Sequence, residues 1–228
     1  MKKTLILILA LALITGCSSG FKKKKLLYRS LDVAYYKLKK KNIKQAKSLK
    51  NKINHPFQAD AVTDFTNVLK NISYKKTSSI GSFEDKLFKK KEAEQIGQQI
   101  QQAFSRLAED EFLVAVKVSN ETDSVMPSYT LTTVLGWVEN DNKLNLVFGD
   151  VDTYITTDRA RNYNAWSSID PIVLSHKVDN SVILKGNGYE FKKVNGFDNN
   201  RWVVVNIKPA APEDKTPPNT RVIIKKEP

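Results

Sequence analysis

The feature that most constrains the fold is a two-residue alternation of apolar side chains that begins near Phe112. The runs interpreted as strands are 112–118, 129–137, 144–148, 182–185, 189–194 and 201–208. Such an alternation sends successive side chains to opposite faces of a β-strand. Turn-forming residues separate the runs, most clearly Glu139–Asn142 and Gly186–Gly188. We therefore expect an antiparallel β-sheet or a small β-sandwich over about residues 112–208.

The preceding part of the chain has apolar residues at steps of three and four, which is the spacing of an amphipathic helix. The first such series comprises Leu27, Leu31, Ala34 and Leu38. Further helices are expected at about 57–73 and 83–110, with Thr77–Gly81 as a loop and Ser82 with Asp85 as a capping box. The predicted fold class is α+β, with N-terminal amphipathic helices at about 22–110 ahead of the sheet. The expected organisation has five parts: a cleaved segment 1–16, a basic tether 17–25, a helical region 26–110, a β-rich domain 111–208 and a proline-rich tail 209–228.

Positive charge is concentrated in one short segment. The chain has 37 Lys and Arg residues against 24 Asp and Glu residues, a net charge of +13. Residues 21–53 hold 13 bases and one acid, Asp32, so 13 − 1 = +12 of that excess lies there. A nucleic-acid partner is not expected, because the rest of the chain is nearly neutral. We interpret the lysines nearest the start of the segment as an anionic-surface site: Lys22, Lys23, Lys24, Lys25, Lys37, Lys39, Lys40 and Lys41. The alternative is that the apolar residues between them pack inward and the lysines are only solvated.

A short apolar run precedes the basic segment. Lys2 and Lys3 come before ten apolar residues, Leu5–Ile14, which are too few to span a bilayer but typical of a secretory signal. The quartet Ile14-Thr15-Gly16-Cys17 follows, and it resembles the lipobox of bacterial lipoprotein precursors. This resemblance implies diacylglyceryl transfer to the Cys17 sulfur, cleavage after Gly16 and, in many species, N-acylation. An ordinary signal peptide or a short anchor that contains a cysteine is the alternative.

The resemblance also implies a location in the cell envelope. Ser18 follows the cysteine where inner-membrane retention would favour Asp, so the outer membrane is preferred over the plasma membrane. A Gram-positive source would place the same anchor on the plasma membrane. Two or three acyl chains are enough for stable attachment of an otherwise soluble protein.

The sequence contains no nucleophile elbow, phosphate-binding glycine loop or paired-histidine zinc motif. We therefore predict no catalytic residue, no metal site and no cofactor. His176 falls within an alternating run and is interpreted as a core residue, whereas His55 before Pro56 suggests a surface or turn position.

Carboxylates are the remaining candidates for chemistry. Asp150 and Asp152 lie two residues apart, so on a strand they would share one face and could bind a cation or act as an acid/base pair. A solvated strand start is the preferred reading, in which changes to either residue are mild. The acidic run Glu109–Glu111 is expected to pair with lysines of the basic segment.

Aromatic residues suggest where a ligand or partner would bind. Trp137 and Trp202 are interpreted as core residues, whereas Trp166 lies in the polar stretch 159–168. Long connections on a β-scaffold often carry function. The candidate recognition loop therefore contains Arg159, Arg161, Tyr163 and Trp166.

Three function classes follow from these patterns. The preferred one is a non-enzymatic structural, assembly or protein-interaction module, anchored in the membrane through acylated Cys17 and bound to an envelope protein. The second is a protein that binds an anionic lipid or polymer through the basic segment. The third is a carboxylate-dependent hydrolase, which ranks last because no catalytic constellation is evident.

Overall fold

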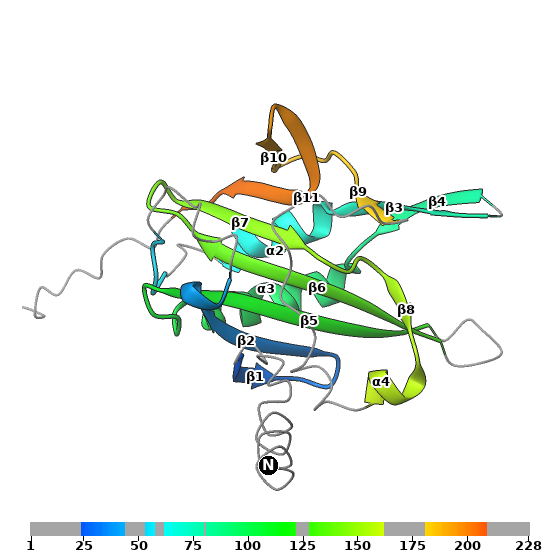
Figure 1. The fold of residues 1–228 in the computed structure, drawn as a ribbon, viewed down its shortest axis with the longest axis horizontal. Coiled ribbons are helices and arrows are strands. Elements are labelled where there is room, and N and C mark those ends of the chain that lie inside the picture. Colours follow the sequence, from blue (N-terminus) through cyan, green and yellow to red (C-terminus); the bar gives the residue numbers. More distant parts are fainter. Residues whose placement is uncertain are drawn as a thin grey trace, which may run out of the picture.

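The computed structural model describes residues 24–43, 53–57, 62–79, 81–121, 128–161 and 181–208. Eight strands of this part form the main sheet: β1 (Lys25–Arg29), β2 (Val33–Lys39), β5 (Glu111–Glu121), β6 (Ser128–Val138), β7 (Lys143–Phe148), β8 (Thr153–Ile155), β10 (Glu190–Val194) and β11 (Phe197–Asn206). They run in the order β1-β2-β5-β6-β7-β11-β10, with β8 paired to β6, and every pairing is antiparallel. Strands from both ends of the described chain therefore share one sheet (Figure 1).

A smaller sheet extends from one side of the main sheet (Figure 1). It consists of β3 (Ser73–Ser78), β4 (Gly81–Lys86) and β9 (Ser181–Ile183), with β3 in the middle. All six residues of β4 are exposed, so this strand forms an outer edge. The small sheet brings residues near 76 and residues near 181 together.

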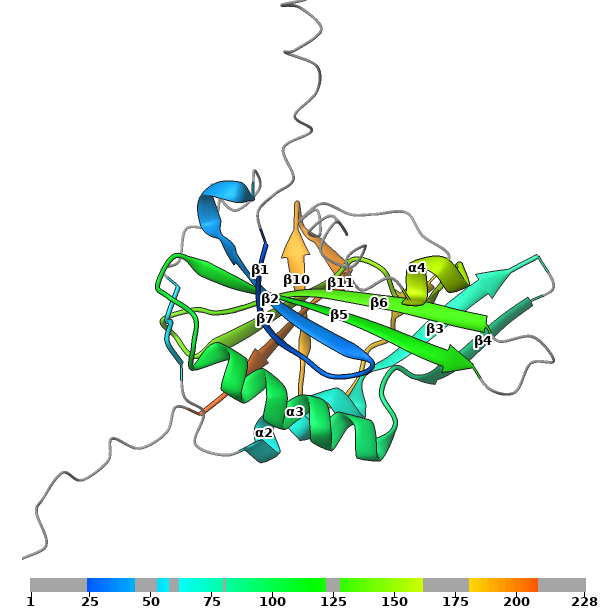
Figure 2. The same ribbon diagram turned by 90° about the horizontal axis from the view of Figure 1, so that it is seen from below.

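Two helices cover one face of the main sheet (Figure 2). They are α2 (Val62–Asn71) and α3 (Lys90–Phe104). In α3 the buried residues recur at helical spacing, and Ile96, Ile100 and Phe104 belong to the same hydrophobic cluster as Leu146 of β7 and Val203 of β11. This cluster fixes the helices to the sheet, because burying one large aliphatic side chain contributes about 1.5–3 kcal/mol.

The opposite face of the main sheet carries a second hydrophobic cluster. It contains Tyr36, Val116, Leu135, Trp137 and Trp202, among others. The two indole rings meet edge to face at a centroid distance of 5.4 Å. The central strands are thus buried on both faces, which is unusual for an antiparallel sheet and reduces the polar alternation in their sequences.

The predicted arrangement of N-terminal helices followed by a sheet is wrong. Residues 25–29 and 33–39 form β1 and β2, which join the main sheet, and 73–78 and 81–86 form β3 and β4. Of the segment expected to be helical, only α2, α3 and the short 3-10 helix η1 (Lys40–Asn42) are helical among the described residues. The strands expected after residue 111 are present as antiparallel strands. No described helix has the length and apolarity needed to cross a bilayer.

The predicted start of the long helix is also wrong. Ser82 and Asp85 lie in β4, and the helix begins only at Lys90. The backbone N–H of Lys89 donates to Glu92 Oε2 at 3.1 Å, so Glu92 provides the carboxylate that satisfies the first turn. Residues 209–228 lie outside the described residues.

Candidate functional site

The register of the first hairpin brings two runs of lysines together. Lys25 at the start of β1 is paired with Lys37 near the end of β2, and η1 follows with Lys40 and Lys41. Lys24 lies beside this end, with its ammonium 5.6 Å from the centre of the Tyr36 ring. The structure therefore gathers Lys24, Lys25, Lys37, Lys39, Lys40 and Lys41 at one end of a hairpin. Cys17, Lys22 and Lys23 lie outside the described residues.

One predicted neutralisation is confirmed. The ammonium of Lys37 lies 3.1 Å from Glu111 Oε2, which joins the basic segment to the acidic run before β5. Burial alone would raise the pKa of Glu111, but hydrogen bonds from the Ala108 N–H and from Lys37 outweigh burial and lower it. Lys37 is thus engaged within the fold, whereas Lys39 and Lys41 are exposed.

The candidate carboxylates lie in the connection between β7 and β8, and they serve different partners. Asp150 accepts a hydrogen bond from the Thr133 hydroxyl at 3.2 Å, and its backbone N–H donates to the same hydroxyl oxygen at 2.8 Å. Asp152 has a left-handed backbone, with φ of 49°, and lies two residues further on. The expectation that both occupy one strand face is wrong, because a turn separates them.

Asp152 is the centre of a polar and aromatic group that joins the small sheet to the main sheet. Tyr74 donates to Asp152 Oδ2 at 2.8 Å, and the Lys76 ammonium donates to Asp152 O at 2.6 Å and to Oδ2 at 3.2 Å. The same ammonium lies 4.0 Å from the centre of the Tyr154 ring and 6.0 Å from that of Phe83. We call Tyr74, Lys76, Phe83, Asp152 and Tyr154 the Lys76 cluster.

The electrostatics of the cluster favour a fixed ion pair. Burial alone would raise the pKa of Asp152, but hydrogen bonds from Thr130 and Tyr74 and the charge of Lys76 outweigh burial and lower it. Asp152 is therefore a carboxylate at neutral pH, able to accept hydrogen bonds and unsuited to donate a proton. The expectation of a solvated carboxylate is wrong, because only 14% of its side chain is exposed.

We expect Asp152→Asn to lower the free energy of unfolding by about 1–3 kcal/mol, because it leaves the Lys76 ammonium without its counter-ion in a largely buried place. Asparagine tolerates the left-handed backbone, so the effect isolates the lost charge. Urea unfolding measures it. The matched control is Asp141→Asn, which removes an exposed partner of Lys143 and should cost less than ~0.5 kcal/mol. Equal decreases in the free energy of unfolding of the two variants would contradict the structural role of Asp152.

The outer rim of the cluster consists of exposed aromatic rings. Tyr154 is 61% exposed and Phe83 is 48% exposed, although both belong to residue types that usually pack inside. The helix α4 (Thr157–Arg161) follows directly after β8, and Arg159 and Arg161 are exposed on it. The described half of the predicted recognition loop, Arg159 and Arg161, thus begins five residues after Tyr154 in the sequence. Tyr163 and Trp166 lie outside the described residues.

The remaining candidate residues are two tryptophans and the two histidines of the chain. Trp137 and Trp202 are buried in the second cluster, which confirms that they are core residues. His55 is buried rather than on the surface: its Nδ1 lies 2.7 Å from Glu111 O, and Val138 N–H donates to its Nε2 at 3.1 Å. His55 therefore joins the start of β5 to the end of β6. His176 lies outside the described residues.

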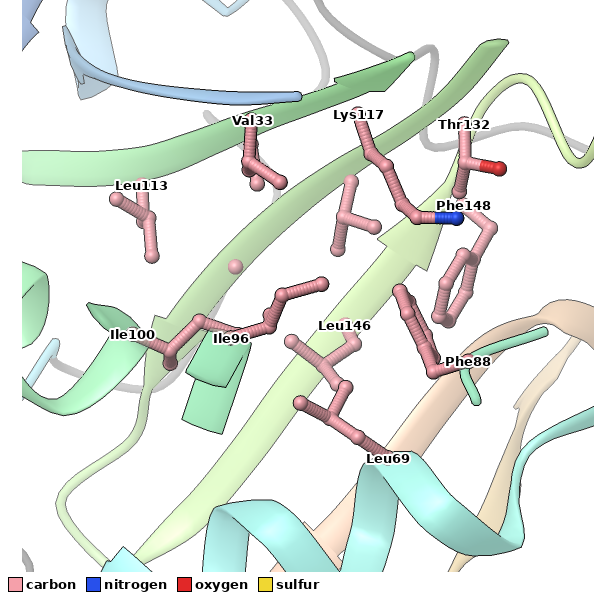
Figure 3. A pocket seen from close by; sticks show the side chains of 13 residues that line it. Val33, Leu69, Phe88, Ile96, Ile100, Leu113, Lys117, Thr132, Leu146 and Phe148 are labelled. Carbon is pink, nitrogen blue, oxygen red and sulfur yellow. The ribbon is translucent and has the colours of Figure 1, made fainter. Parts of the chain in front are cut away.

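A small apolar cavity lies between the sheet and the two helices. Its volume is about 30 Å³, and its walls include Leu69, Ile96, Leu146 and Phe148, with Lys117 at one end (Figure 3). Lys117 is engaged there with Glu92 of α3 at 2.9 Å. The cavity is far smaller than the ~300–1,000 Å³ typical of ligand pockets, so we interpret it as an imperfection of core packing.

The chain was compared with protein-family models, curated proteins and solved structures. No match was found in any of the three. Within the part of the chain that the structure describes, no group of three His, Cys, Asp or Glu side chains is placed to hold a metal ion. The site is therefore interpreted from its own geometry.

Two surfaces result from this geometry. One is the lysine-rich end of the first hairpin, whose residues the charge pattern identified. The other is the rim of the Lys76 cluster, of which the sequence indicated Asp152 but neither Lys76 nor Phe83. Lys76 and Phe83 were missed because the sequence predicts a loop at 77–81 followed by a helix. They lie instead in β3 and β4 of the small sheet, and Lys76 meets the main sheet through Asp152 in the β7–β8 connection.

Proposed function

We propose that this chain is a membrane-anchored cell-envelope lipoprotein that acts as a non-enzymatic protein-interaction module. The lipobox resemblance at Ile14–Cys17 supports the anchor, and its Ser18 favours the outer membrane. The observation that carries the interaction role is the pair of exposed rings, Tyr154 and Phe83, whose centres lie 4.0 Å and 6.0 Å from the Lys76 ammonium. Exposed aromatic side chains are enriched at protein interfaces, and tyrosine is among the residues that contribute most to binding there.

The rigidity of this rim supports recognition. Lys76 is fixed by Asp152, and Asp152 is fixed by Tyr74, so the base of the rim is already ordered before a partner binds. A preordered surface loses less side-chain entropy on association. Two exposed arginines, Arg159 and Arg161, follow Tyr154 on α4.

A carboxylate-dependent hydrolase has less support. Such an enzyme needs two carboxyl groups facing one substrate, with one able to donate a proton. Asp150 is bonded to Thr133, and Asp152 is held as a carboxylate by Tyr74 and Lys76. Both groups act as cross-links within the fold, and this favours the interaction role.

A photo-crosslinking experiment tests the interaction. A benzophenone amino acid replaces Tyr154 in one version of the full chain and Phe197 in another, because Phe197 is 80% exposed and lies at the start of β11. In intact cells we expect a discrete product from position 154 and none of the same size from 197. Adding Phe83→Ala should reduce that product at least several-fold, since it removes the other exposed ring of the cluster. The same product from both positions, or none from 154, would contradict the proposal.

The anchor has its own test. We expect Cys17→Ser to abolish incorporation of an alkyne fatty acid and to leave an uncleaved precursor, because the thiol that would accept the lipid is gone. Cys17 is the sole cysteine of the chain, so no other thiol can substitute. In-gel fluorescence after click labelling measures incorporation. Equal labelling of variant and wild type would show that Cys17 is not the lipidated residue.

A further inference from the structure

The lysine-rich end of the first hairpin lies beside the point where the described chain begins. We propose that this end is a docking surface for an anionic phospholipid membrane, and the proposal rests on the lipid anchor put forward above. We define the docking surface as Lys24, Lys25, Leu26, Lys39, Lys40 and Lys41. It is formed by the start of β1, the end of β2 and η1, at the edge of the main sheet where β1 lies (Figure 1).

Antiparallel pairing creates this surface from two separate stretches of sequence. Lys25 lies opposite Lys37, so the beginning of β1 and the end of β2 are neighbours. The lysines at 39–41 continue from that end through η1. A helical segment would have spread these lysines around its circumference, whereas the hairpin collects them on the side from which the tether arrives.

The local charge balance remains positive after nearby acids are counted. The docking surface has five lysines, and the exposed acids beside it are Glu109 and Asp110, since Lys40 N–H donates to Asp110 O. This leaves 5 − 2 = +3. Lys37 is excluded because Glu111 neutralises it, and Asp32 lies at the opposite, turn end of the hairpin. The surface thus complements a layer of anionic headgroups.

The tether and one apolar side chain argue for a membrane as the occupant. Lys24 is the seventh residue after Cys17, so it stays within about 25 Å of the acylated cysteine. Confinement at this range raises the effective concentration of headgroups, and even a weak contact is then populated. Leu26, which follows Lys25 on the edge strand β1, is 52% exposed, and an apolar side chain next to basic ones suits the headgroup region.

The contribution of the lysines can be estimated. Each basic residue near an anionic leaflet changes the ratio of docked to undocked protein by about fivefold, within a Debye length of ~8 Å at physiological salt. Replacing three of them should therefore lower this ratio on the order of a hundredfold. The loss should disappear in high salt, where both proteins are undocked.

The single native cysteine makes a site-specific experiment practical. Once Cys17 is acylated, a cysteine introduced by Leu26→Cys is the only free thiol and accepts an environment-sensitive fluorophore. The acylated full chain is reconstituted into vesicles of phosphatidylglycerol with phosphatidylcholine, or of phosphatidylcholine alone. The reference label is placed by Phe197→Cys, at the exposed start of β11. Vesicle flotation is measured in the same samples.

The matched charge variants are two lysine triplets. One replaces Lys39, Lys40 and Lys41 with Gln, and the control replaces the exposed Lys89, Lys90 and Lys91 at the start of α3 with Gln. Both remove three charges. We expect the label at 26 to shift to the blue on phosphatidylglycerol vesicles and to lose this shift in high salt and in the 39–41 variant. The 89–91 variant should retain it, and the label at 197 should not respond.

The outcomes separate the two proposals. Loss of flotation would overturn the anchor and the docking surface together. Flotation with equal responses at 26 and 197, or with a response that ignores phosphatidylglycerol and salt, would overturn only the docking surface. A response at 26 in detergent that grows with protein concentration would show instead that a second copy pairs with β1, and this also contradicts membrane docking.

Discussion

Replacing His55 with alanine should lower the free energy of unfolding by about 3–5 kcal/mol. The imidazole accepts a hydrogen bond from Val138 N–H and contacts Glu111 O through its other nitrogen, so the variant leaves two backbone groups of the central sheet without this partner. It also removes a ring packed against Phe104, at a centroid distance of 5.4 Å. A cavity and unsatisfied polar groups are the two most costly results of a core substitution.

Chemical denaturation at neutral pH measures this loss. His55→Gln provides the comparison, because an amide can replace one of the two hydrogen bonds. Its free energy of unfolding should therefore lie between that of the wild type and that of His55→Ala. A loss below about 1 kcal/mol for His55→Ala would contradict the bridging role of the ring.

The same residue should make stability depend on pH. Burial lowers the pKa of His55 to about 4, partly offset by the hydrogen bond to Glu111 O. The unfolded chain has a pKa near 6.5, so it takes up a proton at higher pH than the folded protein does. Stability should therefore be complete above about pH 6.5 and fall as the pH is lowered toward 4, by up to about 3 kcal/mol.

The difference between wild type and His55→Gln isolates this effect. Glu111 and Asp152 have lowered pKa values and also lose their stabilising contribution in acid, but they are present in both proteins. We expect the stability difference between the two proteins to narrow between pH 6.5 and 4. A difference that is constant over this range would show that His55 does not titrate as its burial implies.

Arg201→Met should lower the free energy of unfolding by about 2–4 kcal/mol. Arg201 is buried in β11, and its guanidinium donates to Gly149 O after β7 and to Ser181 O of β9. One side chain thus joins the main sheet to the small sheet. Methionine fills similar volume but leaves both carbonyl groups without this donor.

The conservative variant provides the control. Lysine keeps the charge but cannot reach two carbonyl groups with a planar fork, so Arg201→Lys should recover only part of the loss. Thermal unfolding monitored by circular dichroism measures all three proteins. Full recovery by lysine would contradict the two-carbonyl geometry and leave charge alone as the cause.

The N-terminal strands could not be predicted from apolar spacing, and β2 shows why. Its residues Val33–Tyr36 are buried on both faces of the sheet, so apolar residues follow one another without alternation. With Leu27, Leu31 and Leu38 nearby, the same residues also satisfy a helical period. The aromatic and β-branched content of VAYYKLK was the available signal for a strand.

The later strands were predictable because turn-forming residues delimit short runs of apolar and β-branched residues, and α3 was predictable because it has a clear solvent side. In α3 the buried positions Ile96, Ile100 and Phe104 are separated by polar residues at helical spacing. A candidate surface could be predicted from the sequence only where its residues are close together along the chain. The lysines stand out within one short segment, whereas Lys76 and Asp152 are 76 residues apart and meet only where the small sheet contacts the β7–β8 connection of the main sheet.

The strand order has a consequence for how the protein can form during synthesis. β2 pairs with β5, so the first hairpin must wait for a partner more than seventy residues further along the chain. β11 lies between β7 and β10, and the sheet is therefore complete only after residue 206 has been made. Long-range pairings of this kind slow folding, because the entropy of closing large loops is lost before contacts are gained. The chain should remain open until nearly all of it has emerged, and its native contacts should then form late and together.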